Sequence, residues 1–130
     1  MSDNLFGRFH KSTVEKKGTI KGLHYQIEPY QEIKIVRCVR GAIFDIRVKL
    51  DTLKKEFIFL NSPDRYAVIP SDYAHGYQTL EDNCEIEYFI TNQYSPENAR
   101  GLHWNDPKLS IQWPFQNPTV NERDSSWRLL

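Results

Sequence analysis

The chain of 130 residues lacks several features that mark particular classes of protein. It has no excess charge, because seventeen lysines and arginines balance seventeen aspartates and glutamates. A nucleic-acid-binding domain normally carries a basic surface, so this balance argues against that class. No apolar run approaches the roughly 20 residues of a membrane-spanning helix, and the first residues lack the basic-then-apolar order of a signal peptide. We therefore expect a soluble cytoplasmic protein that binds neither nucleic acid nor membrane.

Cysteine and histidine are also scarce. Cys38 and Cys84 lie far apart, form no Cys-x-x-Cys pair and occupy β-type runs, so we expect reduced core residues. The histidines are His10, His24, His75 and His103. Many β-barrels that bind a metal begin the site with two histidines two residues apart, but Gln26 occupies that position after His24. His75 alone cannot hold a divalent ion. The sequence thus predicts no metal and no cofactor.

Alternating apolar and polar residues dominate what is present. They predict strands over residues 32–39, 42–50, 56–60, 66–69, 77–80 and 84–91, separated by turn clusters. The first two runs flank a turn at Arg40-Gly41 and predict a hairpin. Residues 95–100 could form one helical turn, capped by Ser95 and with Pro96 at its first position.

The fold class and domain organisation follow from this pattern. Short strands with regular turns and no long amphipathic helix favour an all-β sandwich or barrel. The length suits one domain spanning residues 1–130. Within it we expect an N-terminal arm over residues 1–15 and an extended C-terminal segment over residues 114–130.

Two segments place a histidine beside a glycine where the chain otherwise indicates β-structure, residues 22–26 (Gly-Leu-His-Tyr-Gln) and 69–76 (Ile-Pro-Ser-Asp-Tyr-Ala-His-Gly). A histidine exchanges a proton near neutral pH, and acid–base chemistry also needs an acid and a group that holds developing charge. His24 suits the base, while Lys34 and Asp45 lie on the polar faces of their strands, which suggests a lined cavity. A turn histidine, solvated surface charges and a core aromatic at Tyr88 explain the same residues equally well.

Longer motifs resemble one family. Residues 18–26 (Gly-Thr-Ile-Lys-Gly-Leu-His-Tyr-Gln), 34–45 (Lys-Ile-Val-Arg-Cys-Val-Arg-Gly-Ala-Ile-Phe-Asp) and 69–77 resemble motifs of the dTDP-4-dehydrorhamnose 3,5-epimerases, and further matches follow in the same order to residue 124. The resemblance implies a double-stranded β-helix (the cupin jelly roll) without a metal, usually a homodimer. It also implies a nucleotide-linked 4-keto-6-deoxy sugar as substrate, epimerised at C3, C5 or both during deoxysugar and surface-polysaccharide synthesis.

The resemblance also implies roles for individual residues. His24 matches the base, Asp124 the carboxylate paired with it, Lys34 the group that stabilises the enolate, and Tyr88 the acid that returns a proton from the opposite face. The implied substrate-binding residues are Lys21, Gln26, Asp45, His75 and Tyr94.

The chain departs from the family pattern at several positions. Lys21 replaces an arginine, which keeps the charge but loses the two-pronged contact with phosphate. Phe89 replaces the lysine that usually follows the acid tyrosine. Family members also carry roughly forty further residues before the position of Lys16, which normally supply a strand exchanged across the dimer and part of the nucleotide site. A non-catalytic sugar-binding jelly roll and a sugar-nucleotide 3,4-ketoisomerase of the same fold remain alternatives.

Overall fold

Strands supply nearly all the regular structure of the computed structural model, which describes residues 7–130. They are β1 (Arg8–Val14), β2 (Thr19–Gln26), β3 (Lys34–Arg40), β4 (Ile43–Lys49), β5 (Lys55–Leu60), β6 (Ala67–Ile69), β7 (Tyr73–Thr79), β8 (Cys84–Ile90), β9 (Ala99–Gly101) and β10 (Thr119–Val120). A 3₁₀ turn, η2 (Pro96–Asn98), and one short helix, α1 (Glu122–Ser125), complete the described elements. The all-β prediction is confirmed.

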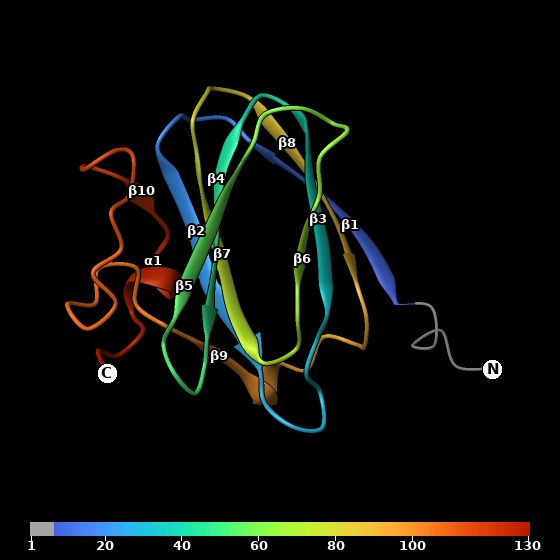
Figure 1. Ribbon diagram of the computed structural model, residues 1–130, viewed down its shortest axis with the longest axis vertical. Coiled ribbons are helices and arrows are strands. Elements are labelled where there is room, and N and C mark those ends of the chain that lie inside the picture. The colour runs from blue at the N-terminus through green and yellow to red at the C-terminus, as the bar shows by residue number, and fades with distance from the viewer. Residues whose placement is uncertain (1–6) are drawn as a thin grey trace.

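The strands form two sheets that face each other (Figure 1). One has the order β1-β8-β3-β6, and the other has the order β10-β2-β7-β4-β5 with β9 also paired to β2. Within residues 7–130 the strands pair antiparallel, except that β10 runs parallel to β2. We call the two sheets the β1–β6 sheet and the β10–β5 sheet. The chain crosses repeatedly between them, so residues far apart in sequence meet inside the barrel.

The predicted hairpin is wrong. Strands β3 and β4 are consecutive, but β3 pairs with β6 and β8, whereas β4 pairs with β5 and β7. The link at Gly41 and Ala42 carries the chain from one sheet to the other. Alternation indicates which face of a strand is buried, but two strands can bury those faces against each other across a barrel as well as side by side.

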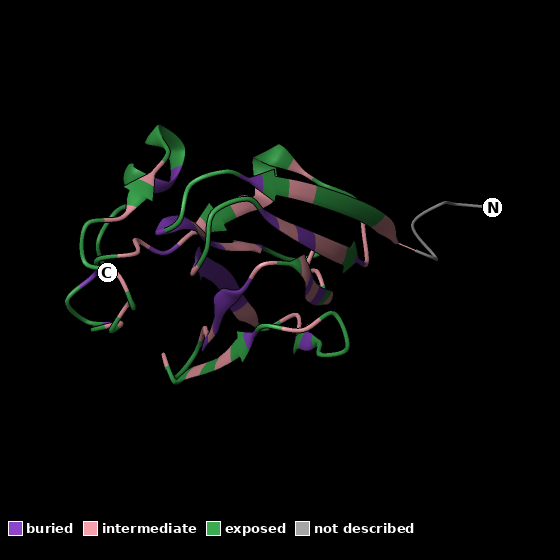
Figure 2. Ribbon diagram, turned by 90° about the horizontal axis from the view of Figure 1, so that it is seen from above, coloured by how far each residue is buried: buried purple, intermediate pink, exposed green. Residues whose placement is uncertain are grey.

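Two apolar clusters stabilise the fold, and the first of them joins the two sheets. The first lies inside the barrel and includes Val36 and Cys38 of β3 and Ile86 of β8, all fully buried. Both cysteines are free and buried, as expected, and burial raises the pKa of Cys38 to about 12. In Figure 2 the buried residues gather toward the middle of the molecule, and along the outer strands more buried residues alternate with exposed ones.

The second cluster explains why the barrel interior holds charges. Phe44, Ile46 and Val48 of β4 pack with Leu102 and Leu109 from the C-terminal part of the chain, which covers the outer face of the β10–β5 sheet. The opposite face of β4 therefore points into the barrel. Asp45 on that face is only 1% exposed, so this charge is enclosed rather than solvated.

The terminal segments contain more regular structure than an arm and an extended tail. Residues 8–14 of the expected N-terminal arm form β1, which pairs with β8 along its length; residues 1–6 lie outside the described residues. Residues 114–130 contain β10 and α1. The predicted helical turn is shorter than expected: it runs from Pro96 to Asn98, Ser95 occupies the N-cap position without a side-chain capping bond, and residues 99–101 form β9. Across residues 7–130 no helix has the length and apolar character needed to cross a membrane.

Candidate active site

A bulge in β2 directs two side chains into the barrel. Lys21 pairs with Tyr77 and His24 pairs with His75, so three steps along β2 match two steps along β7. A regular strand would place Lys21 and His24 on opposite faces, but one extra residue brings both into the same cavity. Gly22 makes the bulge feasible because it has no Cβ. Its φ is +110°, and a Cβ at this position would clash with the backbone of β7.

His24 forms a pair with Asp124 of α1. The Nε2 atom of His24 lies 2.6 Å from Oδ1 of Asp124, which is 1% exposed, whereas the His24 side chain is 32% exposed to the cavity. Burial lowers the pKa of His24, although the hydrogen bond and the charge of Asp124 oppose this effect. His24 is therefore kept neutral around neutral pH, the form in which a histidine accepts a proton.

Asp124 is held by donors from three directions. Besides His24, it accepts hydrogen bonds from the backbone N–H of Gly22 (3.1 Å) and from Nε1 of Trp127 (3.2 Å). Its own backbone N–H donates to the side chain of Asn121, which caps α1. Burial by itself would raise the pKa of Asp124, but the interactions with His24, Gly22 and Trp127 bring it below its ordinary value. It therefore faces His24 as a carboxylate.

A second histidine–aspartate pair lies beside the first. His75 is the register partner of His24, and its Nε2 lies 2.7 Å from Oδ1 of Asp45 on the neighbouring β4. His75 and Asp45 are both almost fully buried. The sequence placed these two residues in one pocket but did not predict that they bond to each other.

Lys34 and Tyr88 face these histidines from the other sheet. Burial lowers the pKa of Lys34, while the charges of Glu32 and Asp45 raise it. Its ammonium makes no hydrogen bond to the residues that the structure describes. Burial, together with the neighbouring Tyr77 phenol, raises the pKa of Tyr88 well above its ordinary value, so Tyr88 keeps its proton. Its ring lies edge-on to His75, with 6.4 Å between centroids.

These groups line a cavity of about 470 Å³. Its wall also contains Lys21, Arg123 and Tyr94, and no aspartate or glutamate of the described chain lines it. Neither Lys21 nor Arg123 has an ion-pair partner among residues 7–130. A cavity with this excess of cations suits an anionic ligand.

Gln26 takes a different position from the one expected of a substrate ligand. It is 4% exposed, and its amide donates to the carbonyls of Tyr30 and Gln93 and accepts from the backbone N–H of Ser95. It therefore fixes the loop that carries Tyr94. Sequence reasoning missed Arg123, although this residue directly precedes Asp124, and it missed Arg8 and His10 because β1 was not predicted.

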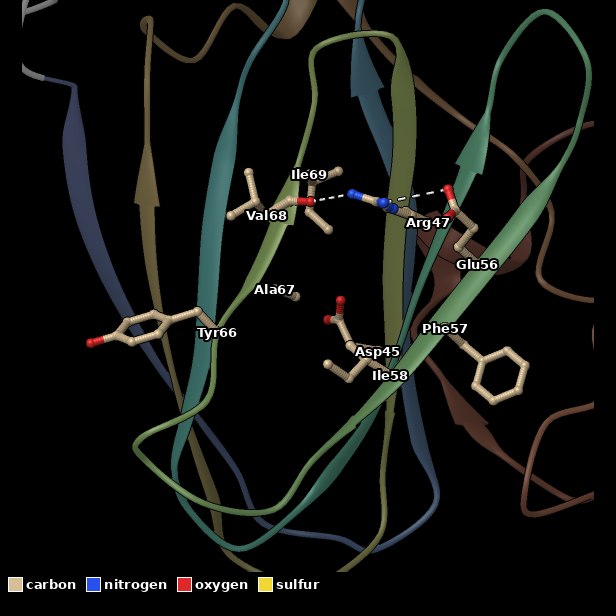
Figure 3. A pocket seen from close by; sticks show the side chains of 9 residues that line it. All are labelled: Asp45, Arg47, Glu56, Phe57, Ile58, Tyr66, Ala67, Val68 and Ile69. Atoms are coloured by element: carbon tan, nitrogen blue, oxygen red, sulfur yellow. Dashed lines mark hydrogen bonds and ion pairs between the residues drawn. The ribbon is translucent and has the colours of Figure 1, made fainter.

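A second cavity, of about 270 Å³, lies between the edges of β5 and β6 (Figure 3). Arg47 spans it, donating to the carbonyl of Val68 and pairing with Glu56 at 3.4 Å. Asp45 lines this second cavity, whereas its partner His75 lines the first. Of these two cavities among residues 7–130, the first is the one lined by both histidines of the pairs together with Lys34 and Tyr88. Within the described residues, no group of three His, Cys, Asp or Glu side chains is placed to hold a metal ion.

Comparison with known proteins agrees with this geometry. The family model described as dTDP-4-dehydrorhamnose 3,5-epimerase matches residues 5–130. The protein of that name from Sinorhizobium fredii is 42% identical over 124 residues, which cover 90% of this chain and 64% of the relative. The chain spans a similar share, 63%, of the Shigella flexneri relative.

Solved structures extend the likeness to the fold. The Bacillus anthracis dTDP-4-dehydrorhamnose 3,5-epimerase, crystallised with TDP and pyrophosphate, superposes with a TM-score of 0.91 at 30% identity, covering 95% of this chain and 74% of that one. The 3,5-epimerase from Legionella pneumophila, in complex with dTDP-4-keto-L-rhamnose, gives 0.85 at 27% identity, with 95% and 69% covered. The predicted cupin jelly roll is confirmed, and this chain belongs to the dTDP-4-dehydrorhamnose 3,5-epimerase family.

Proposed function

We propose that the protein epimerises a nucleotide-linked 4-keto-6-deoxy sugar at C3, C5 or both, within deoxysugar synthesis. The observation that carries this proposal is the arrangement of His24 and Tyr88 on opposite sheets around one cation-lined cavity. Inversion of a carbon centre requires proton removal on one face and proton return on the other. The names and bound ligands of the Bacillus and Legionella relatives support the same substrate class.

His24 acts as the base in the proposed reaction. Its Nε2 faces Asp124, so Nε2 carries a proton and donates a hydrogen bond to that carboxylate, while Nδ1 is left to accept the sugar proton. The C4 ketone acidifies the hydrogens on C3 and C5. As the C–H bond breaks, its electron pair forms the C=C bond of an enolate, and Asp124 stabilises the imidazolium that results.

Lys34 and Tyr88 complete the proton transfer. The ammonium of Lys34, which makes no hydrogen bond within residues 7–130, is available to the C4 oxygen, where the negative charge develops. Tyr88 then donates its phenolic proton to the same carbon from the other side, and the carbonyl re-forms. These steps move protons within one substrate and its pocket, so they call for no cofactor.

The remaining polar groups of the cavity bind and orient the substrate in this proposal. Lys21 and Arg123 offer unpaired cations to the diphosphate. Tyr94 is exposed enough to contact a sugar or base, and Gln26 holds its loop in place. His75 lines the wall beside Tyr88, and its bond to Asp45 holds the His75 ring in place.

A homodimer is part of the proposal, and one surface fits it. Phe9, Phe89, Ile35 and Val68 are register partners that form a row across all four strands of the β1–β6 sheet. They lie on its outer face and are 39–60% exposed. A contiguous apolar row of this kind is uncommon on a monomer's surface.

Charges beside this row favour a second copy of the chain as the partner. Lys11, Glu87 and Arg37 are also register partners across the same sheet, so the face carries both signs. A twofold axis can then place acid against base on both sides of the interface. We expect a dimer in light scattering at micromolar concentration and a monomer for the Phe89→Lys variant. A monomeric wild-type protein, or a variant that remains dimeric, would reject this interface.

Deuterium exchange tests the proposed reaction. A dTDP-linked 4-keto-6-deoxy sugar is incubated with the protein in D₂O, and NMR follows deuterium entry at C3 and C5. We expect exchange and inversion with wild-type protein and neither with His24→Asn. A panel of nucleotide sugars in thermal-shift assays identifies the preferred nucleotide. Stabilisation by a 4-keto sugar without exchange would instead establish the non-catalytic binding module.

A further inference from the structure

Trp127 contacts the proposed base pair from the C-terminal segment. Its Nε1–H donates to Oδ1 of Asp124 at 3.2 Å, the same oxygen that lies 2.6 Å from Nε2 of His24. The backbone N–H of Gly22 donates to the other carboxylate oxygen, Oδ2. His24 and Trp127 therefore share one acceptor atom, and their rings meet at 70° with 6.4 Å between centroids.

A glycine on the neighbouring strand makes room for the indole. Gly101 of β9 is the register partner of His24, and a Cβ built at Gly101 would fall among the ring atoms of Trp127. The backbone of Gly101 is not in the left-handed region, so space for the indole accounts for the absence of a side chain there. Arg123 covers the indole at 5.4 Å from the ring centroid. The indole is thus held from three sides.

We propose that Trp127 is a positioning residue for the His24–Asp124 pair, and that its indole N–H limits how tightly His24 holds a proton. This inference rests on the proposed function, in which His24 must be unprotonated to act. A carboxylate oxygen that accepts from two donors has less charge available for each. Without the indole N–H, Asp124 would stabilise the imidazolium more strongly, and His24 would be protonated at a pH where it is otherwise free.

The other charged and titratable groups around His24 are the same in the wild type and in a Trp127 variant. They come from α1, the strands β1, β2, β3, β7, β8 and β9, and the adjoining loops: Arg8, His10, Lys21, Tyr25, Glu32, Lys34, His75, Tyr77, Tyr88, Tyr94, Arg100 and Arg123. Lys34 and Arg123 also lower the pKa of His24. A change in proton affinity on replacing Trp127 is therefore assigned to the shared oxygen.

The variant Trp127→Phe keeps an aromatic ring beneath Arg123 and removes the N–H donor. We measure the deuterium exchange rate as a function of pH. In this variant we expect the acid limb of that profile, where the rate falls with decreasing pH, to move to higher pH, with rates about threefold to tenfold lower there. At the alkaline plateau the rate stays within about twofold, because the neutral base is then fully formed. The matched control is Trp113→Phe, which loses an indole hydrogen bond to the carbonyl of Trp104 and should leave the profile unchanged.

Two further measurements separate positioning from mere packing. Gly101→Ala pushes the intact indole aside and should shift the acid limb in the same direction, with no further shift in the double variant. NMR titration of the His24 ring, identified by loss of its signal in His24→Gln, reports the proton affinity without any turnover.

The outcomes are distinct. An unmoved His24 midpoint in Trp127→Phe, an equal rate loss at every pH, or the same shift in Trp113→Phe would overturn the proposal. Absence of exchange in the wild-type protein would instead reject the proposed function, and the NMR titration would still decide the role of Trp127. If Gly101→Ala does not fold, Trp127→Phe and its control are sufficient to decide between the two roles.

Discussion

Removing the phenolic oxygen of Tyr88 should separate proton removal from inversion. In Tyr88→Phe, His24 can still take the proton and Lys34 can still hold the enolate, so deuterium continues to enter the sugar. Without the phenol, proton return on the inverting face loses its donor. General acid catalysis contributes roughly 10²–10⁴-fold, so formation of the epimer should fall by about that factor while exchange falls far less.

The structure also sets the cost in stability and supplies a control. Tyr77 lies beside Tyr88, with 6.4 Å between their ring centroids, and each phenol affects the pKa of the other. Tyr88→Phe and Tyr77→Phe each remove one phenolic oxygen and keep the ring. Both should lower the free energy of unfolding by about 1 kcal/mol. Because Tyr77 is not the proposed donor, only the Tyr88 variant should uncouple exchange from inversion.

The assay follows both events in one NMR experiment in D₂O, where deuterium content and the two epimers are resolved. The quantity compared is the ratio of exchange to inversion. A ratio that is unchanged in Tyr88→Phe would show that Tyr88 is not the donor. An equal rise in Tyr77→Phe would show that the effect belongs to the phenol pair rather than to proton donation.

Three further predictions follow from the same geometry. His24→Asn should lower exchange and inversion by roughly a hundredfold or more with the fold retained, and near-normal exchange would remove His24 from the mechanism. Lys34→Met should slow exchange at C3 and C5 alike, by roughly 10²–10³-fold, because both pass through the C4 enolate; slowing at one centre only would contradict this. The free energy of unfolding should fall as pH drops below the ordinary His24 value of 6.5, since the folded state resists protonation there and the unfolded state does not. The pKa of Asp124 is lowered from its ordinary value of 3.8 in the folded state. Asp124 therefore adds to the free energy of unfolding above pH 3.8, and this contribution is lost as the pH falls further. Chemical denaturation from pH 7 to pH 3 measures this, and His24→Asn should flatten the slope between pH 7 and 5; an unchanged slope would refute the assignment.

The sequence predicted the strands β3 to β8 because alternation reports burial directly, whereas β1, β2, β9 and β10 were not among the predicted ranges. The polar face of β4 illustrates this: the alternation of Phe44, Asp45 and Ile46 indicated one apolar and one polar face, and both faces are buried against different layers. Strand β7 begins at Tyr73, four residues before the predicted start. Residues 73–76 lack a β-branched pattern, yet they pair with β4 throughout, so tertiary pairing outweighs local preference there.

Pairing partners were beyond the same reasoning. The wrong hairpin and the missed β1 share a cause: period-two patterns specify a face but not the strand that will lie alongside. Strand β1 carries charged residues on both faces, since Arg8 and His10 line the cavity while Lys11 lies on the outer face. It therefore resembles a solvated segment until β8 is placed beside it.

The site was predicted as a set of residues rather than as an arrangement. The family motifs indicated His24 and Asp124, but their bond joins residues one hundred positions apart and depends on the β2 bulge and on the cap of α1. Trp127 had no signal at all, because its role requires the empty space above Gly101. Contacts of this kind arise from the closed fold, and a linear pattern contains no record of them.

The two histidine–aspartate pairs show how burial assigns different work to similar chemistry. Both pairs have nearly the same Nε2–Oδ1 distance, 2.6 and 2.7 Å, and they lie side by side on β2 and β7. The His24 side chain is 32% exposed to the cavity, whereas that of His75 is 4% exposed. A group that takes a proton from substrate in each turnover must also release it to water, and only His24 has that access. The buried pair is therefore suited to holding the pocket wall in a fixed hydrogen-bonded state, and the exposed pair to cycling between its two protonation states.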